Sequence, residues 1–133
     1  MKTNYKVAIA LVAGAAIGGA AIQGLHAQAK PPIYLVTEVD VTNPEAYGRE
    51  FVPKVQALFK AMGARDLARG GGAPGTPQVT VYEGAPSKRV GIQVWDSLEK
   101  IEAFRNSAEF KEARRIGDKY ATFRSYAIEG VPQ

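Results

Sequence analysis

The spacing of apolar residues changes several times along the chain, and the order of these changes constrains the fold more than any single motif. Residues 33–41 alternate towards their end with the period of two that a half-buried strand requires. Apolar side chains then recur at helical spacing over 47–62, and strict alternation returns over 89–95. A second helical stripe over 98–120 precedes a last strand pattern over 122–129. The pattern therefore predicts strands and helices in regular succession.

A further strand is expected between the first helix and residues 89–95. It starts at Arg65 to Arg69 and meets a segment rich in glycine and proline over residues 70–77, which breaks regular structure. The strand pattern resumes from Gln78 to Glu83, so the second strand is expected to be interrupted and then to continue. Glu83 and Arg89 flank the following turn and are expected to pair across it.

Capping patterns mark the beginnings of the predicted helices. Asn43 before Pro44 offers an N-cap with proline at the first helical position. Pro53 lies inside that helix and should kink or divide it. Asp96 with Glu99 three residues on fits a capping box for the second helix, and Ser107 is expected to cap a further helical piece.

Strand, helix, strand, strand, helix, strand is the order of a ferredoxin-like α+β domain, a split βαβ arrangement with one antiparallel sheet. Helices on one side of such a sheet leave its other face bare. A second copy of the chain is the simplest cover for that face, so the fold predicts a homodimer.

Residues 1–29 have the order of a secretory signal peptide. Lys2 and Lys6 precede an uncharged run from Val7 to Ile22, and the small residues Ala27-Gln28-Ala29 follow. The run is shorter than the roughly 20 residues that span a bilayer as a helix. We therefore expect cleavage after Ala29 and a periplasmic or secreted domain over residues 30–133. The alternative is an uncleaved anchor, and only then would the protein contact a membrane.

Cleavage would change the chemistry that the chain can perform. His26 is the only histidine, it lies in the segment to be removed, and the chain has no cysteine. The remaining domain would lack His-based and Cys-based nucleophilic machinery, disulfides and nearly all ligands for zinc, copper or haem. We expect no cofactor and no metal. Loss of Lys2 and Lys6 would leave 15 of the 17 basic residues against 13 acidic ones, a charge too small to indicate nucleic-acid binding.

A set of short motifs in a fixed order gives the chain a family resemblance. Over residues 33 to 131 it resembles the domain of unknown function 1330 family (DUF1330), and the motifs are Arg69-Gly70-Gly71, Tyr82-Glu83-Gly84, Lys88-Arg89-Val90, Ser97-Leu98-Glu99 and Asn106-Ser107-Ala108-Glu109-Phe110. The resemblance implies a dimeric α+β barrel, the architecture of cofactor-free monooxygenases of the antibiotic-biosynthesis type and of several small binding proteins. It implies no reaction. Met62 and Val94 replace a histidine and an acid that relatives often carry.

Strand alternation provides the candidate site. It sets Tyr34, Val36 and Glu38 on the face opposite Leu35, Thr37 and Val39. The residues expected to line a cavity between the sheet and the dimer partner, and there to bind a ligand, are Tyr34, Glu38, Arg69, Gln93, Trp95 and Tyr126. Alternatively, Glu38 pairs with a nearby arginine and the aromatic residues only pack the dimer interface. Arg69 beside three glycines could hold an anion, or the glycines could form only a bulge and a loop.

Two classes of function follow, and whether the protein is an enzyme stays open. In the first, the domain binds a small, partly apolar ligand or a protein partner. In the second, it is a cofactor-independent enzyme in which Glu38 or a tyrosine acts as general base. The absence of His and Cys from residues 30–133 favours binding. A third possibility is an assembly role that depends on dimerisation alone.

Overall fold

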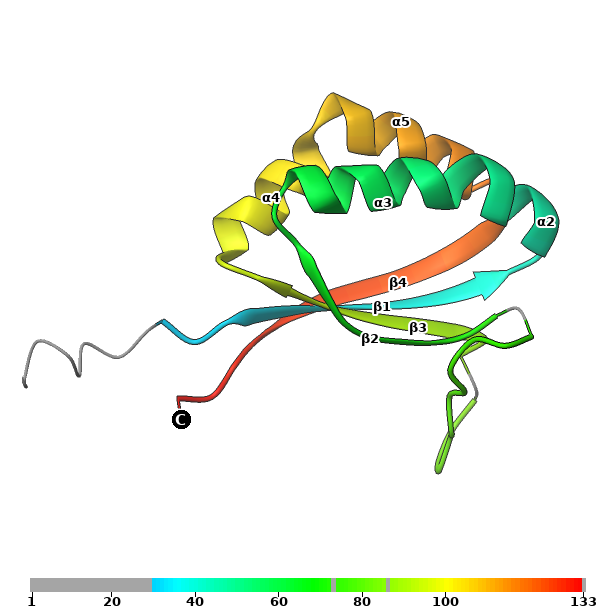
Figure 1. The fold of residues 1–133 in the computed structure, drawn as a ribbon, viewed down its shortest axis with the longest axis horizontal. Coiled ribbons are helices and arrows are strands. Elements are labelled where there is room, and N and C mark those ends of the chain that lie inside the picture. The colour runs from blue at the N-terminus through cyan, green and yellow to red at the C-terminus, as the bar shows by residue number, and fades with distance from the viewer. Residues whose placement is uncertain (1–29, 73, 86, 133) are drawn as a thin grey trace, which may run out of the picture. The chain divides into compact units, whose positions relative to one another are not determined.

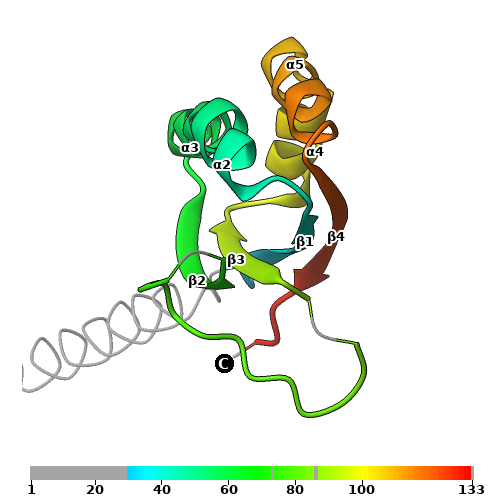
Figure 2. The same cartoon turned by 90° about the vertical axis from the view of Figure 1, so that its right-hand side faces the viewer.

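The computed structural model describes residues 30–72, 74–85 and 87–132. The predicted signal peptide lies outside these residues. Residues 31–131 form one compact unit around an antiparallel four-stranded sheet of order β2-β3-β1-β4. The strands are β1 (Ile33–Val41), β2 (Arg65–Gly71), β3 (Arg89–Trp95) and β4 (Ala121–Glu129). The helices of residues 30–132 that the structure describes lie on one face of the sheet (Figures 1 and 2), so the ferredoxin-like arrangement is confirmed.

The first helical segment is divided at Pro53, as predicted. It consists of α2 (Pro44–Ala46), a π-helical turn η1 (Tyr47–Phe51) and α3 (Val52–Ala61). The side chain of Asn43 caps it, because its Oδ1 accepts the amide hydrogen of Ala46 at 3.1 Å. Proline has no amide hydrogen to donate to the carbonyl four residues back, and the wider π turn ends at Phe51, two residues before Pro53.

The second helical segment consists of α4 (Leu98–Asn106) and α5 (Ala108–Gly117). The prediction of Asp96 as the cap of α4 is wrong by one residue. Ser97 Oγ accepts the amide hydrogen of Lys100 at 3.2 Å, while Asp96 forms an ion pair with the ammonium group of Lys100. Ser107 caps α5 as predicted, because its Oγ accepts the amide hydrogen of Phe110 at 3.2 Å.

The predicted continuation of the second strand over residues 78–83 is wrong. Gly71 and Gly72 both have positive φ angles, 77° and 104°, and turn the chain out of the sheet. A Cβ atom on Gly71 would lie only 2.1 Å from the carbonyl oxygen of Lys88, so this position requires glycine. The chain then forms an irregular loop that Figure 2 shows leaving the sheet on the side away from the helices.

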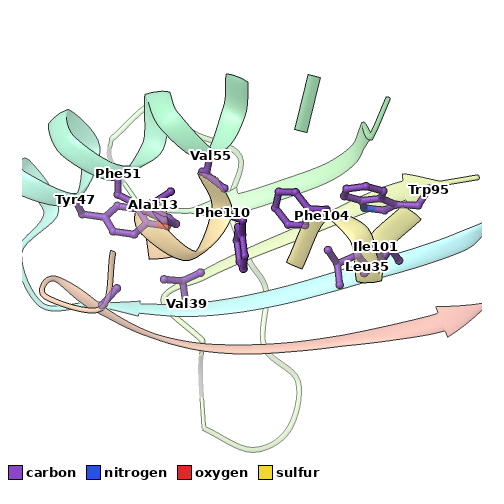
Figure 3. Close-up of a cluster of buried hydrophobic side chains, with 11 residues drawn as sticks. Leu35, Val39, Tyr47, Phe51, Val55, Trp95, Ile101, Phe104, Phe110 and Ala113 are labelled. Atoms are coloured by element: carbon purple, nitrogen blue, oxygen red, sulfur yellow. The ribbon is translucent and has the colours of Figure 1, made fainter. Parts of the chain in front are cut away.

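The core lies between the sheet and the helices. Trp95 and Phe104 are almost fully buried and their ring centres lie 5.3 Å apart. Figure 3 shows Tyr47 and Phe51 at one end of this cluster and Trp95 at the other. The helices therefore cover these rings on one face of the sheet. None of the helices in the described part of the chain is long and apolar enough to cross a membrane.

Candidate functional site

The predicted ligand-binding residues are divided between the two faces of the sheet, so the expectation that they share one cavity is wrong. Leu35 is buried beneath the helices and stands opposite Gln93 in the register. Gln93 and Trp95 therefore face the helices, and both are buried. Along the strands, the side chains of Tyr34, Glu38 and Tyr126 alternate with the helix-facing ones. They lie on the face that the helices leave bare, which we call the open face.

Trp95 belongs to the core and does not reach either a ligand surface or the open face. Its ring packs against Phe59 and Phe104 at centroid distances of 6.2 and 5.3 Å. Only 1% of its surface is exposed, and its Nε1 has no hydrogen-bond partner among the described residues. The predicted role of Trp95 in binding has no support in this position.

Glu38 and Tyr126 do come together on the open face. The Tyr126 hydroxyl donates to Glu38 Oε1 at 3.2 Å, and Ser87 Oγ donates to Glu38 Oε2 at 2.9 Å. Arg124 Nη1 lies 3.8 Å from the same Oε2. This arrangement fits the alternative in which Glu38 pairs with an arginine. A carboxylate that already accepts these contacts is a poor candidate for a general base.

A cavity of about 270 Å³ lies on the other side of the sheet, between the strands and the helices. Its walls are largely apolar and come from both helical segments and the sheet. Gln93 and Arg69 are the only predicted site residues that line it. Its aromatic lining consists of Tyr47, Phe51, Phe59, Phe104, Phe110 and Phe123.

The floor of the cavity is a strip of small and polar residues in the middle of the sheet. Thr37 on β1 and Ser125 on β4 are paired in register, and their hydroxyl oxygens lie 3.1 Å apart. Gly91 on β3 stands opposite Thr37 from the other side. A Cβ atom added to Gly91 would meet no atom within 4 Å. The cavity therefore has free space beside this glycine.

Two arginines lie against the aromatic wall at one end. The guanidinium carbon of Arg89 lies 5.1 Å from the centre of the Tyr47 ring, and that of Arg114 lies 3.9 Å from the centre of the Phe123 ring. Burial raises the pKa of the Tyr47 phenol, although the charge and hydrogen bonding of Arg89 and the charge of Arg114 act against this rise. Tyr47 is thus held protonated at neutral pH and can serve as a hydrogen-bond donor.

The expected pair between Glu83 and Arg89 is not formed. Arg89, like Gly91 and Gln93, lies on the face of β3 that points towards the helices. Glu83 lies in the exposed loop. The alternation over 89–95 could have placed Arg89 beside the helix-facing residues. Nothing in the sequence marked Tyr47 as more than one member of a helical stripe.

Arg69 also lines the cavity, but its guanidinium already has a partner. Arg69 Nη2 lies 2.6 Å from Asp66 Oδ2, and Gln93 Nε2 donates to Asp66 Oδ1 at 3.3 Å. The neighbouring glycines form the turn out of β2, which is the bulge-and-loop alternative. Anion binding by Arg69 would have to compete with Asp66.

Comparisons with known proteins agree with this architecture. The family model described as "Domain of unknown function (DUF1330)" matches residues 32–131. No curated protein matches the sequence. The methylated RPA0582 protein has a TM-score of 0.61 at 12% identity over 85% of this chain and 90% of its own. The unmodified RPA0582, a protein of unknown function from Rhodopseudomonas palustris, has a TM-score of 0.54 at 15% identity over 86% and 94%.

A structure of known activity shares the same fold. SnoaB, a cofactor-independent oxygenase from Streptomyces nogalater, superposes with a TM-score of 0.54 at 12% identity over 77% of this chain and 96% of its own. At this level of identity the likeness establishes the fold and says nothing about the reaction. The chain thus has the fold of dimeric α+β barrel proteins.

Proposed function

The chain belongs to the DUF1330 family, described only as a domain of unknown function, and from this premise we propose that it binds a small, mainly apolar molecule. The binding site is the cavity between the sheet and the helices. This location differs from the sequence-based expectation, which placed the cavity between the sheet and a dimer partner.

The observation that carries this proposal is a cavity formed within a single chain. Its volume of about 270 Å³ is near the lower end for small-molecule sites, which begin at roughly 300 Å³. Small-molecule sites are mostly apolar with a few polar groups that orient the ligand. Here the aromatic rings supply the apolar surface, and the hydroxyls of Thr37 and Ser125 supply polar groups at the floor.

Binding is favoured over catalysis by the state of the acid and base groups. Among the described residues that line the cavity, the only carboxylate is Asp66, which Arg69 and Gln93 occupy. Tyr47 is held protonated by burial. Glu38 lies on the open face. A cofactor-independent reaction would need a free base beside the substrate, and none of these groups supplies one.

We further propose that a second copy covers the open face. The residues that point there from β1, β3 and β4 are predominantly apolar: Tyr34, Val36, Val90, Ile92, Val94, Tyr126 and Ile128. Tyr126 and Ile128 are 39% and 50% exposed in the single chain. Apolar side chains gathered on one face of a sheet indicate a protein interface. The fold that the chain shares with dimeric α+β barrel proteins supports a homodimer.

The N-terminal pattern supports export as a separate proposal. Residues 1–29 carry the charged, apolar and small-residue order of a signal peptide. The domain would then act outside the cytoplasm, and binding in the cavity does not depend on this.

Calorimetric titration with 2-naphthamide, a neutral planar aromatic compound, tests the binding proposal. We expect one molecule to bind per protomer of the wild-type protein. The variant Gly91→Val should lose this binding, because its side chain would enter the hollow. Gly48→Val is the matched control, since Gly48 also has nothing within 4 Å of an added Cβ but is exposed in η1. Equal binding by all three proteins, or no binding by the wild type, would contradict the proposal.

A further inference from the structure

Resting on the proposed function, we propose that the cavity selects ligands with a carboxylate at one end, held by Arg89 and Arg114 beside Tyr47. The ligand class is a carboxylic acid with a planar aromatic or short aliphatic body. The apolar body would occupy the space between the aromatic side chains and the sheet.

Arg89 is a half-buried cation whose charge is not balanced locally. Ion pairs shorter than 4.0 Å in the described part of the chain do not include Arg89. A guanidinium carries five N–H donors, and its position beside the Tyr47 ring leaves in-plane donors available for a further acceptor. A half-buried cation of this kind favours an anionic partner, because burial weakens its hydration.

The guanidinium of Arg89 also lies close to the backbone of Gly72. A Cβ atom on Gly72 would lie 2.4 Å from Arg89 Nη2, so the backbone at the start of the loop packs against this group. Tyr47 and Gly72 together restrict the orientation of the guanidinium. Such restriction reduces the entropy lost when a carboxylate binds.

Arg114 supplies a second set of donors at the same end. Its side chain is 28% exposed, and its Nε donates to Asp118 Oδ1 at 2.7 Å. That bond and the stacking on Phe123 fix the guanidinium plane, while the Nη atoms make none of the hydrogen bonds found among the described residues. Asp118 balances the charge of Arg114, so the positive charge of Arg89 remains as the excess at this end.

The alternative is that both arginines only cover the aromatic rings. Stacking over a ring accounts for the orientation of each guanidinium. It does not account for two arginines with open donors at the rim of one apolar cavity, both close enough to Tyr47 for their charges to act on its phenol. A bound carboxylate would accept charge-assisted hydrogen bonds from the remaining N–H donors of both arginines.

A matched pair of probes tests the inference: 2-naphthoate carries the carboxylate, and 2-naphthamide has nearly the same shape without the charge. We expect the wild type to bind 2-naphthoate about tenfold more tightly or better. Arg89→Gln and Arg114→Gln should each remove most of this preference and leave the affinity for 2-naphthamide within about twofold. Arg115→Gln is the control, since Arg115 also lies on α5 but is exposed, pairs with Glu112 and does not line the cavity.

The outcomes separate this inference from the proposed function. Equal affinity for the two probes would overturn the carboxylate selection and leave the cavity as a binding site. Equal losses in Arg115→Gln and Arg89→Gln would also overturn it, because the preference would then come from long-range charge. Failure of the wild type to bind either probe would contradict the proposed function and the inference with it.

Discussion

Gly91 stands directly opposite Thr37 where β3 pairs with β1, and its missing side chain leaves the floor of the cavity open. Glycine usually weakens the interior of a strand, because it adds backbone entropy and offers no side chain to pack. At this position the glycine keeps a hollow next to the Thr37–Ser125 hydroxyl pair.

A series of side chains at Gly91 should separate binding from stability. In Gly91→Ala, Gly91→Val and Gly91→Leu, affinity for 2-naphthamide should fall stepwise as the side chain grows. The melting temperature should not fall for alanine and valine, because their added atoms enter free space and valine suits a strand. Calorimetry and thermal denaturation measure the two effects. A melting temperature that falls from alanine onwards would show that no hollow exists there.

Gly117 at the end of α5, unlike Gly91, has no free space for a side chain. A Cβ atom there would lie 2.8 Å from the ring of Phe51 and 3.0 Å from that of Phe123. Gly117→Ala should therefore destabilise the domain by about 1–3 kcal/mol through overpacking, measured by urea denaturation. Gly48→Ala has free space around its added carbon and should not destabilise. Equal stability of the two variants would contradict the close packing of α5 on these rings.

The open face should respond to charge as an interface does. Ile128→Lys places an ammonium group in the apolar patch and should convert a dimer to monomers in sedimentation velocity experiments. Leu98→Lys is the matched control, because Leu98 on α4 is 47% exposed against 50% for Ile128. A dimer that persists in Ile128→Lys would place the interface elsewhere.

Because Tyr47 is buried, we expect the domain to lose stability in alkaline solution. Burial raises the pKa of its phenol above the usual value of 10.0, so the folded state disfavours the phenolate. The protonated Tyr47 phenol therefore stabilises the folded state fully below about pH 10, and this stabilisation is lost as the pH rises through the folded-state pKa. Tyr47→Phe should flatten the fall in unfolding free energy above that pH. Tyr120→Phe is measured beside it, because the hydrogen bond that Tyr120 donates to Glu50 also raises its pKa. An unchanged pH profile in Tyr47→Phe would mean that the phenol is not buried in solution.

The N-terminal segment makes a prediction that involves no structure. Intact-mass analysis of the protein purified from its own host should give a chain that begins at Lys30 and lacks His26. A full-length chain in the membrane fraction would favour the uncleaved anchor instead.

The bounds of β1 and β3 follow directly from the sequence, because their alternation is not interrupted by breakers. The division of the first helix follows equally directly from Pro53. The break after Gly71 was expected, but the strand predicted over residues 78–83 is wrong, because these residues follow glycines whose positive φ angles turn the chain out of the sheet. The residue pattern of a segment does not predict the direction that the chain takes after such a turn.

The candidate site was harder to predict, because it depends on how strands match across the sheet. Alternation within β1 and within β3 was correct. Which side of β3 shares a face with Leu35 is fixed only by the register that sets Leu35 opposite Gln93. Tyr47 and Arg89 come together only when the first helix lies over that side of the sheet. The contact between Tyr47 and Arg89 therefore could not be predicted from residue spacing in the sequence.

The measurement that tests the central claim most directly is a set of intermolecular NOEs from bound 2-naphthamide to protein methyl groups. Binding between the sheet and the helices predicts NOEs to Leu35, Thr37 and Val39, which point towards the helices. NOEs to Val36, Ile92 and Val94, with none to the first set, would place the ligand on the open face and contradict the account.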